Sequence, residues 1–311
     1  MSSHILLATH GGESAAGAAR VAVQLAQRLH APIDVIAVLA PPPVLDAGYG
    51  PVFVLDETME REAREQLRAD ADAQLQSCGW TNTTGSTCIE GPPTQMILEE
   101  TRARHADLIV VGLGPHHFVD RALGGETALR LAQVADVPVL AVPAGAAEVP
   151  HRVVAAIDFS PTSIEAARLA ASWLTAGDVL LLAHVAPPTS RRAARDDAGA
   201  RSAAESAPHR LPDVAKELPV PSGVTVTPVE LSGDPARALL DFAEREHADL
   251  IALGSHGYGM WKRFMLGSVA SKVLRLATCS VLVVRPTGVQ AGVAAASESR
   301  IAEQTANTGA R

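Results

Sequence analysis

The chain has 311 residues, of which 47% are hydrophobic, and this is enough apolar material for two packed domains. Lys and Arg number 26 against 34 Asp and Glu, which gives a net charge of -8. With 3% aromatic residues as well, the chain lacks both the clustered cations and the stacking surfaces typical of nucleic-acid binding, so we expect no nucleic-acid partner.

Targeting and redox features of the sequence are few. No apolar stretch approaches the ~20 residues that a membrane span requires, so we expect no membrane partner. The first residues, Met1 to Leu7, have no basic lead and predict a first strand rather than a signal peptide. Cys78, Cys88 and Cys279 form no Cys-x-x-Cys pair, which is typical of incidental thiols in a reducing compartment. Together these features predict a soluble cytoplasmic protein.

Strands and helices alternate through the first half of the chain. Short apolar runs bounded by turn residues predict strands, and apolar residues at helical spacing predict helices. The expected elements are, in order, a strand at Ile5–Thr9, a helix at Ser14–Leu29, a strand at Ile33–Leu39, a charged helix at Glu57–Leu75, a strand at Thr83–Glu90, a helix opened by Gly91 and running through Arg104, a strand at Asp107–Val111, a further helix, and a strand at Val137–Val142.

The same order begins again near residue 150. Val153–Ile157 matches the first strand, and Asp178–Val185 leads into Ala-Pro-Pro as the second strand of the first half does. Later matches are Gly233-Asp-Pro with Gly91-Pro-Pro, Ala248-Asp-Leu-Ile with Ala106-Asp-Leu-Ile, and Val281-Leu-Val-Val with Val139-Leu-Ala-Val. A repeat of about 140 residues indicates a duplicated domain, because solenoid units are only ~20 to 50 residues long.

This alternation predicts an α/β protein with two tandem doubly wound domains, each a five-stranded parallel sheet with helices on both faces. The expected domains span residues 1–145 and 150–286, with a linker of mostly small residues at Ala144–Pro150. Residues 287–311 lack apolar periodicity and predict a disordered tail. In open α/β sheets, ligands bind outside the carboxyl ends of the strands, at the point where the strand order reverses.

The clearest chemical signal is the loop from Gly254 to Ser268, which follows the apolar run Ala248–Leu253. Gly254 and Gly257 allow the backbone to turn sharply and to approach a ligand. Gly267 and Ser268 place amide donors and a hydroxyl at the start of the next helix. These groups together predict a site for an anion, and phosphate suits it best.

The spacing Gly-x2-Gly-x9-Gly-Ser, the duplication and the following Val-Leu-Val-Val-Arg strand resemble a tandem universal stress protein. The resemblance covers nearly all of residues 4 to 286, and it implies five parallel strands per domain and, in one subclass, bound ATP. It implies that Asp158 lies near ribose or a bound metal, that Val185 lines the adenine, and that Gly254, Gly257, Gly267 and Ser268 hold the phosphates. His256 inside the loop and Val269 just after it complete the candidate set, and Mg²⁺ is the expected counterion.

The first half departs from this pattern at three positions. Pro115 stands in place of the second loop glycine, and it removes a backbone donor. Glu126 replaces the serine at the helix start, where its charge would repel phosphate by about 4 kcal/mol at 4 Å if the effective dielectric constant is near 20. His10 stands in place of Asp158. We therefore expect one working nucleotide site, in the second domain.

Three functions remain open on the sequence alone. The leading one is a cytoplasmic ATP-binding protein, with a nucleotide-linked role in a stress response or in regulation. A nucleotide-free interaction or dimerisation module, with a purely architectural glycine loop, is the second. The third is a slow ATPase, but no residue stands out to orient water or to stabilise the transition state, so we expect no enzyme. For Asp158, the alternative role is to cap the helix that follows it.

Assembly is expected to involve the fifth strand of each half. Val137–Val142 and Ser280–Val284 would each form an exposed sheet edge, and such edges invite pairing. The resemblance implies that the two domains pair through these edges and that two chains can form a homodimer.

Overall fold

The computed structural model describes residues 4–41, 57–80, 85–113, 125–186, 211–256 and 266–286. The first half contains β1 (Ile5–Thr9), a 3₁₀ turn (Glu13–Ala15), α1 (Ala16–Leu29), β2 (Ile33–Leu39), α2 (Glu57–Ser77), β3 (Thr87–Glu90), α3 (Pro93–Ala103), β4 (Leu108–Leu113), α4 (Gly125–Val134) and β5 (Val139–Pro143). The second half contains β6 (Arg152–Ala156), α5 (Pro161–Ala171), β7 (Val179–Ala186), a helical segment at 211–217, β8 (Thr225–Ser232), α7 (Pro235–Arg245), β9 (Leu250–Gly254), α8 (Ser268–Leu276) and β10 (Ser280–Val284).

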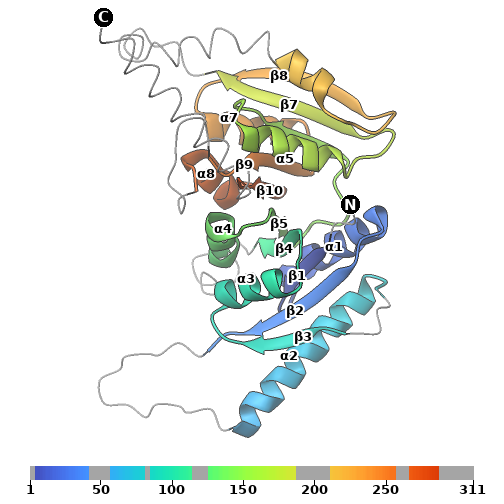
Figure 1. Ribbon diagram of the computed structural model, residues 1–311, viewed down its shortest axis with the longest axis vertical. Helices are drawn as coiled ribbons and strands as arrows, with labels where there is room; N and C mark the ends of the chain where they lie inside the picture. The colour runs from blue at the N-terminus through green and yellow to red at the C-terminus, as the bar shows by residue number, and fades with distance from the viewer. Residues whose placement is uncertain are drawn as a thin grey trace, which may run out of the picture.

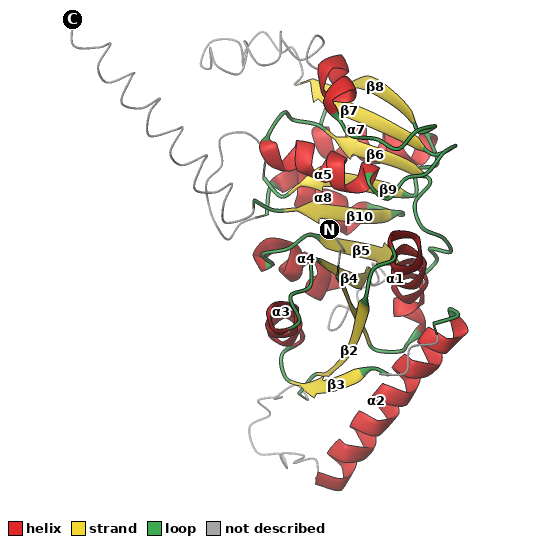
Figure 2. Cartoon of the chain, turned by 45° about the vertical axis from the view of Figure 1, so that its right-hand side comes forward, coloured by secondary structure: helices red, strands yellow, loops and turns green. Residues whose placement is uncertain are grey.

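The ten strands of the described ranges form one sheet, in the order β3-β2-β1-β4-β5-β10-β9-β6-β7-β8 (Figure 1 and Figure 2). Neighbouring strands are parallel within each half. At the centre β5 and β10 pair antiparallel, with Leu140 opposite Leu282. The predicted α/β class and the two parallel five-stranded halves are confirmed, and the two fifth strands pair with each other inside the chain.

Helices cover both faces of this sheet (Figure 2). Side chains at successive strand positions point to opposite faces, so each strand contributes to two cores. One core contains residues of α1, α5 and the end of α2, together with strand residues such as Leu7 and Leu182. The other contains residues of α3, α4, α7 and α8, together with Leu6 and Ala183. Within the described ranges, no helix is both long and apolar enough to cross a membrane.

The linker Ala144–Pro150 lies along a polar stripe on α1. Arg20 donates to two linker carbonyls, at 2.8 and 3.0 Å. Gln24 donates to a third linker carbonyl at 3.1 Å and accepts from the amide of Val149 at 2.9 Å. Arg28, one turn further along, donates to the Trp173 carbonyl in the second half at 3.0 Å. Because residues four apart share a helix face, Arg20, Gln24 and Arg28 form one polar stripe on α1. This stripe contacts both the linker and the second half.

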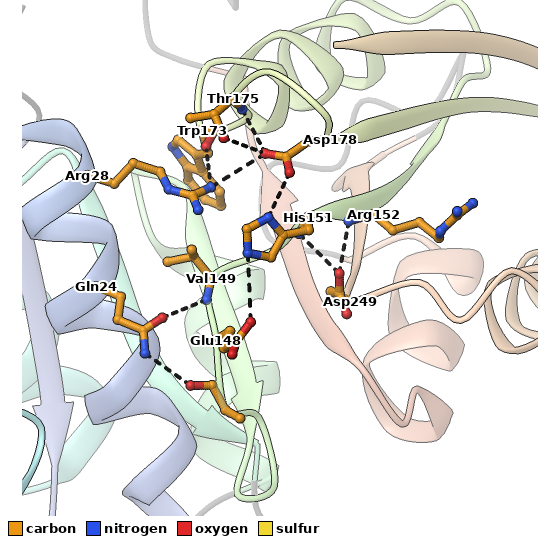
Figure 3. A network of polar contacts seen from close by, with 11 residues as sticks. Gln24, Arg28, Glu148, Val149, His151, Arg152, Trp173, Thr175, Asp178 and Asp249 are labelled. Atoms are coloured by element: carbon orange, nitrogen blue, oxygen red, sulfur yellow. Dashed lines mark hydrogen bonds and ion pairs between the residues drawn. The ribbon is translucent and has the colours of Figure 1, made fainter. Parts of the chain in front are cut away.

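Asp178 is the hub of the polar network at this junction (Figure 3). Its side chain is almost wholly buried and accepts bonds from the Thr175 amide at 2.7 Å, the Thr175 hydroxyl at 3.0 Å and His151 Nδ1 at 2.7 Å. The Arg28 guanidinium lies 3.7 Å away. Burial by itself raises the pKa of Asp178, but the bonds from Thr175 and His151 outweigh it and the pKa is lowered from its ordinary value.

The structure differs from the predicted elements mainly at the outer edges of the sheet. No strand is predicted at Thr225–Ser232, where β8 forms one edge. Pro228 interrupts the run and cannot donate to a strand ladder, but an edge strand tolerates it. The strand predicted from Thr83 begins at Thr87, and residues 81–84 lie outside the described ranges. The predicted tail, 287–311, also lies outside them.

Candidate nucleotide-binding site

A cavity of about 260 Å³ lies at the carboxyl ends of β6, β7 and β9, against the first turns of α7 and α8. From β6 the chain continues to β7 and β8 on one side before it crosses to β9 on the other, so this is the place where the strand order reverses. Six of the predicted site residues line the cavity: Asp158, Val185, Gly254, Gly267, Ser268 and Val269. His256 lies next to the lining residue Ser255, and Gly257 is outside the described residues.

The turn between β6 and α5 carries Asp158 at the rim of the cavity. One carboxylate oxygen accepts from the Ser160 amide at 2.9 Å, and the other has no partner among the described residues. The N-cap of α5 is Ser160, whose hydroxyl accepts from the Ser163 amide at 3.2 Å. The alternative role of Asp158 as the helix cap is therefore filled by Ser160, and one oxygen of the exposed carboxylate is left for a ligand.

Gly254, where β9 ends, packs closely against the start of α5. A Cβ at this position would lie 2.6 Å from Thr162 Oγ1 and 3.0 Å from the Ser163 amide nitrogen. Its φ is not in the left-handed region. The sequence predicts a glycine that frees the backbone for a turn, but the structure shows a glycine required by the close approach of a helix.

Ser255 joins the two ends of the phosphate-loop segment. It is fully buried, its amide donates to the Val284 carbonyl, and its carbonyl accepts from the Gly267 amide, both at 2.8 Å. The His256 carbonyl accepts from the Thr162 hydroxyl at 3.3 Å, and His256 Nδ1 lies 2.8 Å from Ser255 Oγ. The described ends of the loop are thus fixed to β10 and α8 by backbone hydrogen bonds, and to α5 by a bond from the Thr162 side chain.

The start of α8 supplies the donors that an anion needs. Gly267 is the N-cap, and the first helical bond runs from the Ser271 amide to its carbonyl at 2.9 Å. The amides of Ser268, Val269 and Ala270 precede that bond, so they have no acceptor within the helix. No acidic residue lies in the first turn. The positive end of the helix dipole therefore faces the cavity without a competing carboxylate.

Apolar side chains form the other wall of the cavity. Val185 and Ala183 come from β7, Leu253 from β9, and Pro235 and Leu239 from α7. Such a wall suits one face of a flat heterocycle such as adenine. The residues of α7 are not in the predicted set, although the Gly233-Asp-Pro repeat marks a helix start at this sheet edge. Ser163, His184 and Ser255 are also absent from that set.

In the first half, the turn after β1 is bonded to side chains of the same half. His10 Nδ1 accepts from the Gly12 amide at 3.1 Å, so the ring makes the turn bond that Asp158 makes in the second half. Gln74 of α2 accepts from the Thr9 hydroxyl at 2.6 Å and donates to the Gly12 carbonyl at 2.9 Å. These bonds leave fewer groups for a ligand than Asp158 and its turn do. Pro115 and the Glu126 side chain lie outside the described residues.

Metal-binding side chains are sparse. Across the described residues, no group of three or more His, Cys, Asp or Glu is placed to hold a metal ion. Magnesium in nucleotide sites, however, is held by one or two carboxylates together with the substrate phosphates and water. The free oxygen of Asp158 at the cavity rim fits that pattern, in which the nucleotide supplies the other ligands.

Comparisons with known proteins identify relatives of both halves. The model of the universal stress protein family matches residues 1–143 and again residues 150–285. A universal stress protein of Mycolicibacterium smegmatis is 29% identical over 305 residues, which cover 91% of this chain and 97% of that protein. Universal stress protein YxiE of Bacillus subtilis is 42% identical over 71 residues, 23% of this chain, and the chain spans about half (48%) of that relative's length.

Among solved structures, a universal stress protein from Archaeoglobus fulgidus DSM 4304 superposes with a TM-score of 0.62. The alignment covers 93% of this chain and 100% of that one, at 19% sequence identity. At that identity the likeness concerns the fold, which it matches over both halves.

Proposed function

This chain belongs to the universal stress protein family, with two family domains in tandem, and on that premise we propose that it is a regulatory protein that binds ATP with Mg²⁺ in its second domain. The observation that carries the proposal is the gathering of Asp158, Val185 and the start of α8 around one cavity at the carboxyl edge of the sheet. A carboxylate, an apolar wall and unpaired helix amides are the three environments that a ribose or metal, an adenine and a phosphate chain require.

Each part of the nucleotide has a matching group. The adenine would lie against Val185 and the apolar residues of α7, and the phosphates would accept from the first amides of α8 and from the Ser268 hydroxyl. Asp158 would contact a ribose hydroxyl or the metal. Mg²⁺, when bound, would offset the phosphate charge that remains.

We also propose that ATP is bound rather than rapidly hydrolysed, so that the nucleotide state alters the contacts of the protein. Rapid phosphoryl transfer needs a cation at the transition state and a group that orients water. The described residues around the cavity include no Lys or Arg. Phosphate release at saturating ATP should therefore equal that of a buffer blank, and clearly faster release would favour the slow-ATPase alternative.

Isothermal titration with ATP and Mg²⁺ tests the site through one designed charge. Ser268→Glu places at the start of α8 the carboxylate that the first half carries at Glu126. Repulsion of about 4 kcal/mol at 4 Å and an effective dielectric constant near 20 predicts an affinity loss of at least about a hundredfold. Thr94→Glu is the matched control, because it adds the same charge to the first turn of α3, which does not line the cavity.

Two results of the titration would contradict the proposal. If the wild-type protein is folded and nucleotide-free but takes up no ATP, the chain is better described as a nucleotide-free interaction module. If Ser268→Glu binds as tightly as wild type, ATP binds elsewhere and the phosphate site assigned to α8 is wrong.

A further inference from the structure

His184 contacts the residues immediately before and after Asp158, in the turn that follows β6. Its Nδ1 lies 2.7 Å from the carbonyl oxygen of Ile157, the residue before Asp158, so this nitrogen carries the proton and donates. Its ring centroid lies 4.9 Å from that of Phe159, the residue after Asp158. The remaining nitrogen, Nε2, is buried and has no hydrogen-bond partner among the described residues. The described interactions of the imidazole are therefore directed at this turn.

The turn is strained at Phe159. This residue has a φ of 65°, in the left-handed region that a bulky side chain rarely adopts, and it is 8% exposed. Such a conformation persists only where surrounding contacts fix it. His184 contacts Phe159 itself and the carbonyl of Ile157 two residues earlier, and these contacts can fix the strained conformation.

The first half of the chain provides an internal comparison. There the equivalent turn has Gly11 at a φ of 72°, and glycine adopts this conformation without steric cost. Ala8 and Ala156 are equivalent, because each lies two residues before His10 or Asp158. Ala8 pairs with Ile36 and Ala156 pairs with Ala183. The next residues along those partner strands, Ala37 and His184, are therefore equivalent too. The first half has neither the strain nor the histidine, whereas the second half has both.

We propose that His184 is a positioning residue, which holds the strained turn between β6 and α5 so that the Asp158 carboxylate is presented to the nucleotide. The inference deepens the proposed function and rests on it in one respect, the assignment of Asp158 to the bound nucleotide. His184 therefore acts on nucleotide binding indirectly. His184 fixes the backbone on both sides of Asp158, and Asp158 makes the contact.

Two substitutions separate the two contacts of the imidazole. His184→Phe keeps an aromatic ring beside Phe159 and removes the donor to Ile157. His184→Asn keeps an N–H near the place of Nδ1 and removes the ring. We expect His184→Phe to weaken ATP binding about tenfold, the size of one lost hydrogen bond. His184→Asn should bind more tightly than His184→Leu, which has neither contact.

A double-mutant cycle with Asp158→Ala tests the route of the effect. If His184 acts through Asp158, His184→Phe has no further effect on ATP affinity once the carboxylate is gone. An equal loss in both backgrounds would overturn the positioning role, as would wild-type affinity of the single variant.

Amide hydrogen exchange in the nucleotide-free protein makes the test independent of ATP. The Ser160 amide, which donates to Asp158, should exchange several-fold faster in His184→Phe than in wild type. The Ile109 amide, which donates to the Pro138 carbonyl in the first half, should stay unchanged and serves as the internal control. If wild type binds no ATP, the proposed function fails, and this measurement alone decides whether His184 holds the turn. Unchanged exchange at Ser160 would contradict it.

Discussion

Two of the four glycine and serine positions that mark the phosphate loop are explained by backbone packing. A Cβ on Gly254 would meet α5, and one on Gly267 would lie 3.1 Å from the Ser255 carbonyl. Phe159 is the opposite case, a bulky residue in a conformation that favours glycine. Its left-handed backbone costs about 1–2 kcal/mol for a residue with a side chain. The two glycines and Phe159 thus all belong to tightly packed segments around the cavity.

Gly254→Ala tests the packing explanation. The added methyl group would overlap the Thr162 side chain, and the backbone nitrogen of Ser163 leaves little room to move, so we expect unfolding free energy to fall by about 1–3 kcal/mol. Gly145→Ala is the control, because no atom lies within 4 Å of its Cβ position. Urea denaturation measures both. Equal stability of the two variants would show that α5 is not in close contact with Gly254.

At the scale of elements, α1 does more than cover the sheet. Its stripe of Arg20, Gln24 and Arg28 meets the linker and the second half through side-chain bonds to backbone groups. The linker predicted from its small residues is thus an ordered segment, and three of its carbonyls and the Val149 amide are paired with α1. The pairing holds the two halves in one arrangement more firmly than a chain of small residues would by itself.

Gln24→Ala tests the stripe. The substitution leaves the amide of Val149, a buried residue, without its partner, and an unpaired buried donor costs about 1–3 kcal/mol. We expect lower stability in urea and faster amide exchange at Val149. Gln27→Ala, on the exposed side of the same helix, should change stability by less than about 0.5 kcal/mol. Similar losses in both variants would contradict the role of the Gln24 side chain, because helix propensity favours alanine at both positions.

At the scale of the whole molecule, pairing of β5 with β10 merges two domains into one sheet. This pairing uses the edges that the sequence predicts to be exposed, and it leaves β3 and β8 as the outer strands. The expected homodimer stays a prediction, and any pairing of sheets between two chains would have to use one of these outer strands.

Acid should weaken the junction between the halves through Asp178. Its pKa is lower in the folded protein than in the unfolded chain, so its stabilising contribution is complete above the unfolded pKa of about 3.9 and is lost as the pH falls through the lower folded value. Asp178→Asn should cost about 1.5–3 kcal/mol at pH 7, because it removes hydrogen bonds to a charged group. The difference in unfolding free energy between this variant and the wild type should become smaller below about pH 4.

Urea denaturation from pH 7 to pH 3 measures this difference. Asp213→Asn is the control, since the contact of Asp213 among the described residues is an exposed pair with Lys216, and such pairs contribute about 0–1 kcal/mol. A difference for Asp178→Asn that stays constant to pH 3 would show that the carboxylate is not stabilised by its charge.

The stoichiometry of ATP follows from the difference between the two halves. The first half pairs its turn groups with His10 and Gln74, so we expect one equivalent of ATP per chain. Denaturing the purified protein and quantifying the released nucleotide, or titrating nucleotide-free protein, measures this number. Two equivalents would mean that the first half also binds ATP despite these contacts.

The sequence by itself determined the α/β class, the duplication and most strand positions, because apolar periodicity and turn residues are local properties. It also marked Asp158 and Gly254 as site candidates through their places after strands, and Val185 through the resemblance to tandem universal stress proteins. The pairing of β5 with β10, which the resemblance implies, is confirmed by the structure. Only the tertiary structure decided that Gln74 bonds to the turn after β1, that Gly254 is a packing glycine and that His184 contacts the residues on both sides of Asp158. Each of these depends on contacts between segments far apart in the chain, and such contacts leave no periodic signal in the sequence.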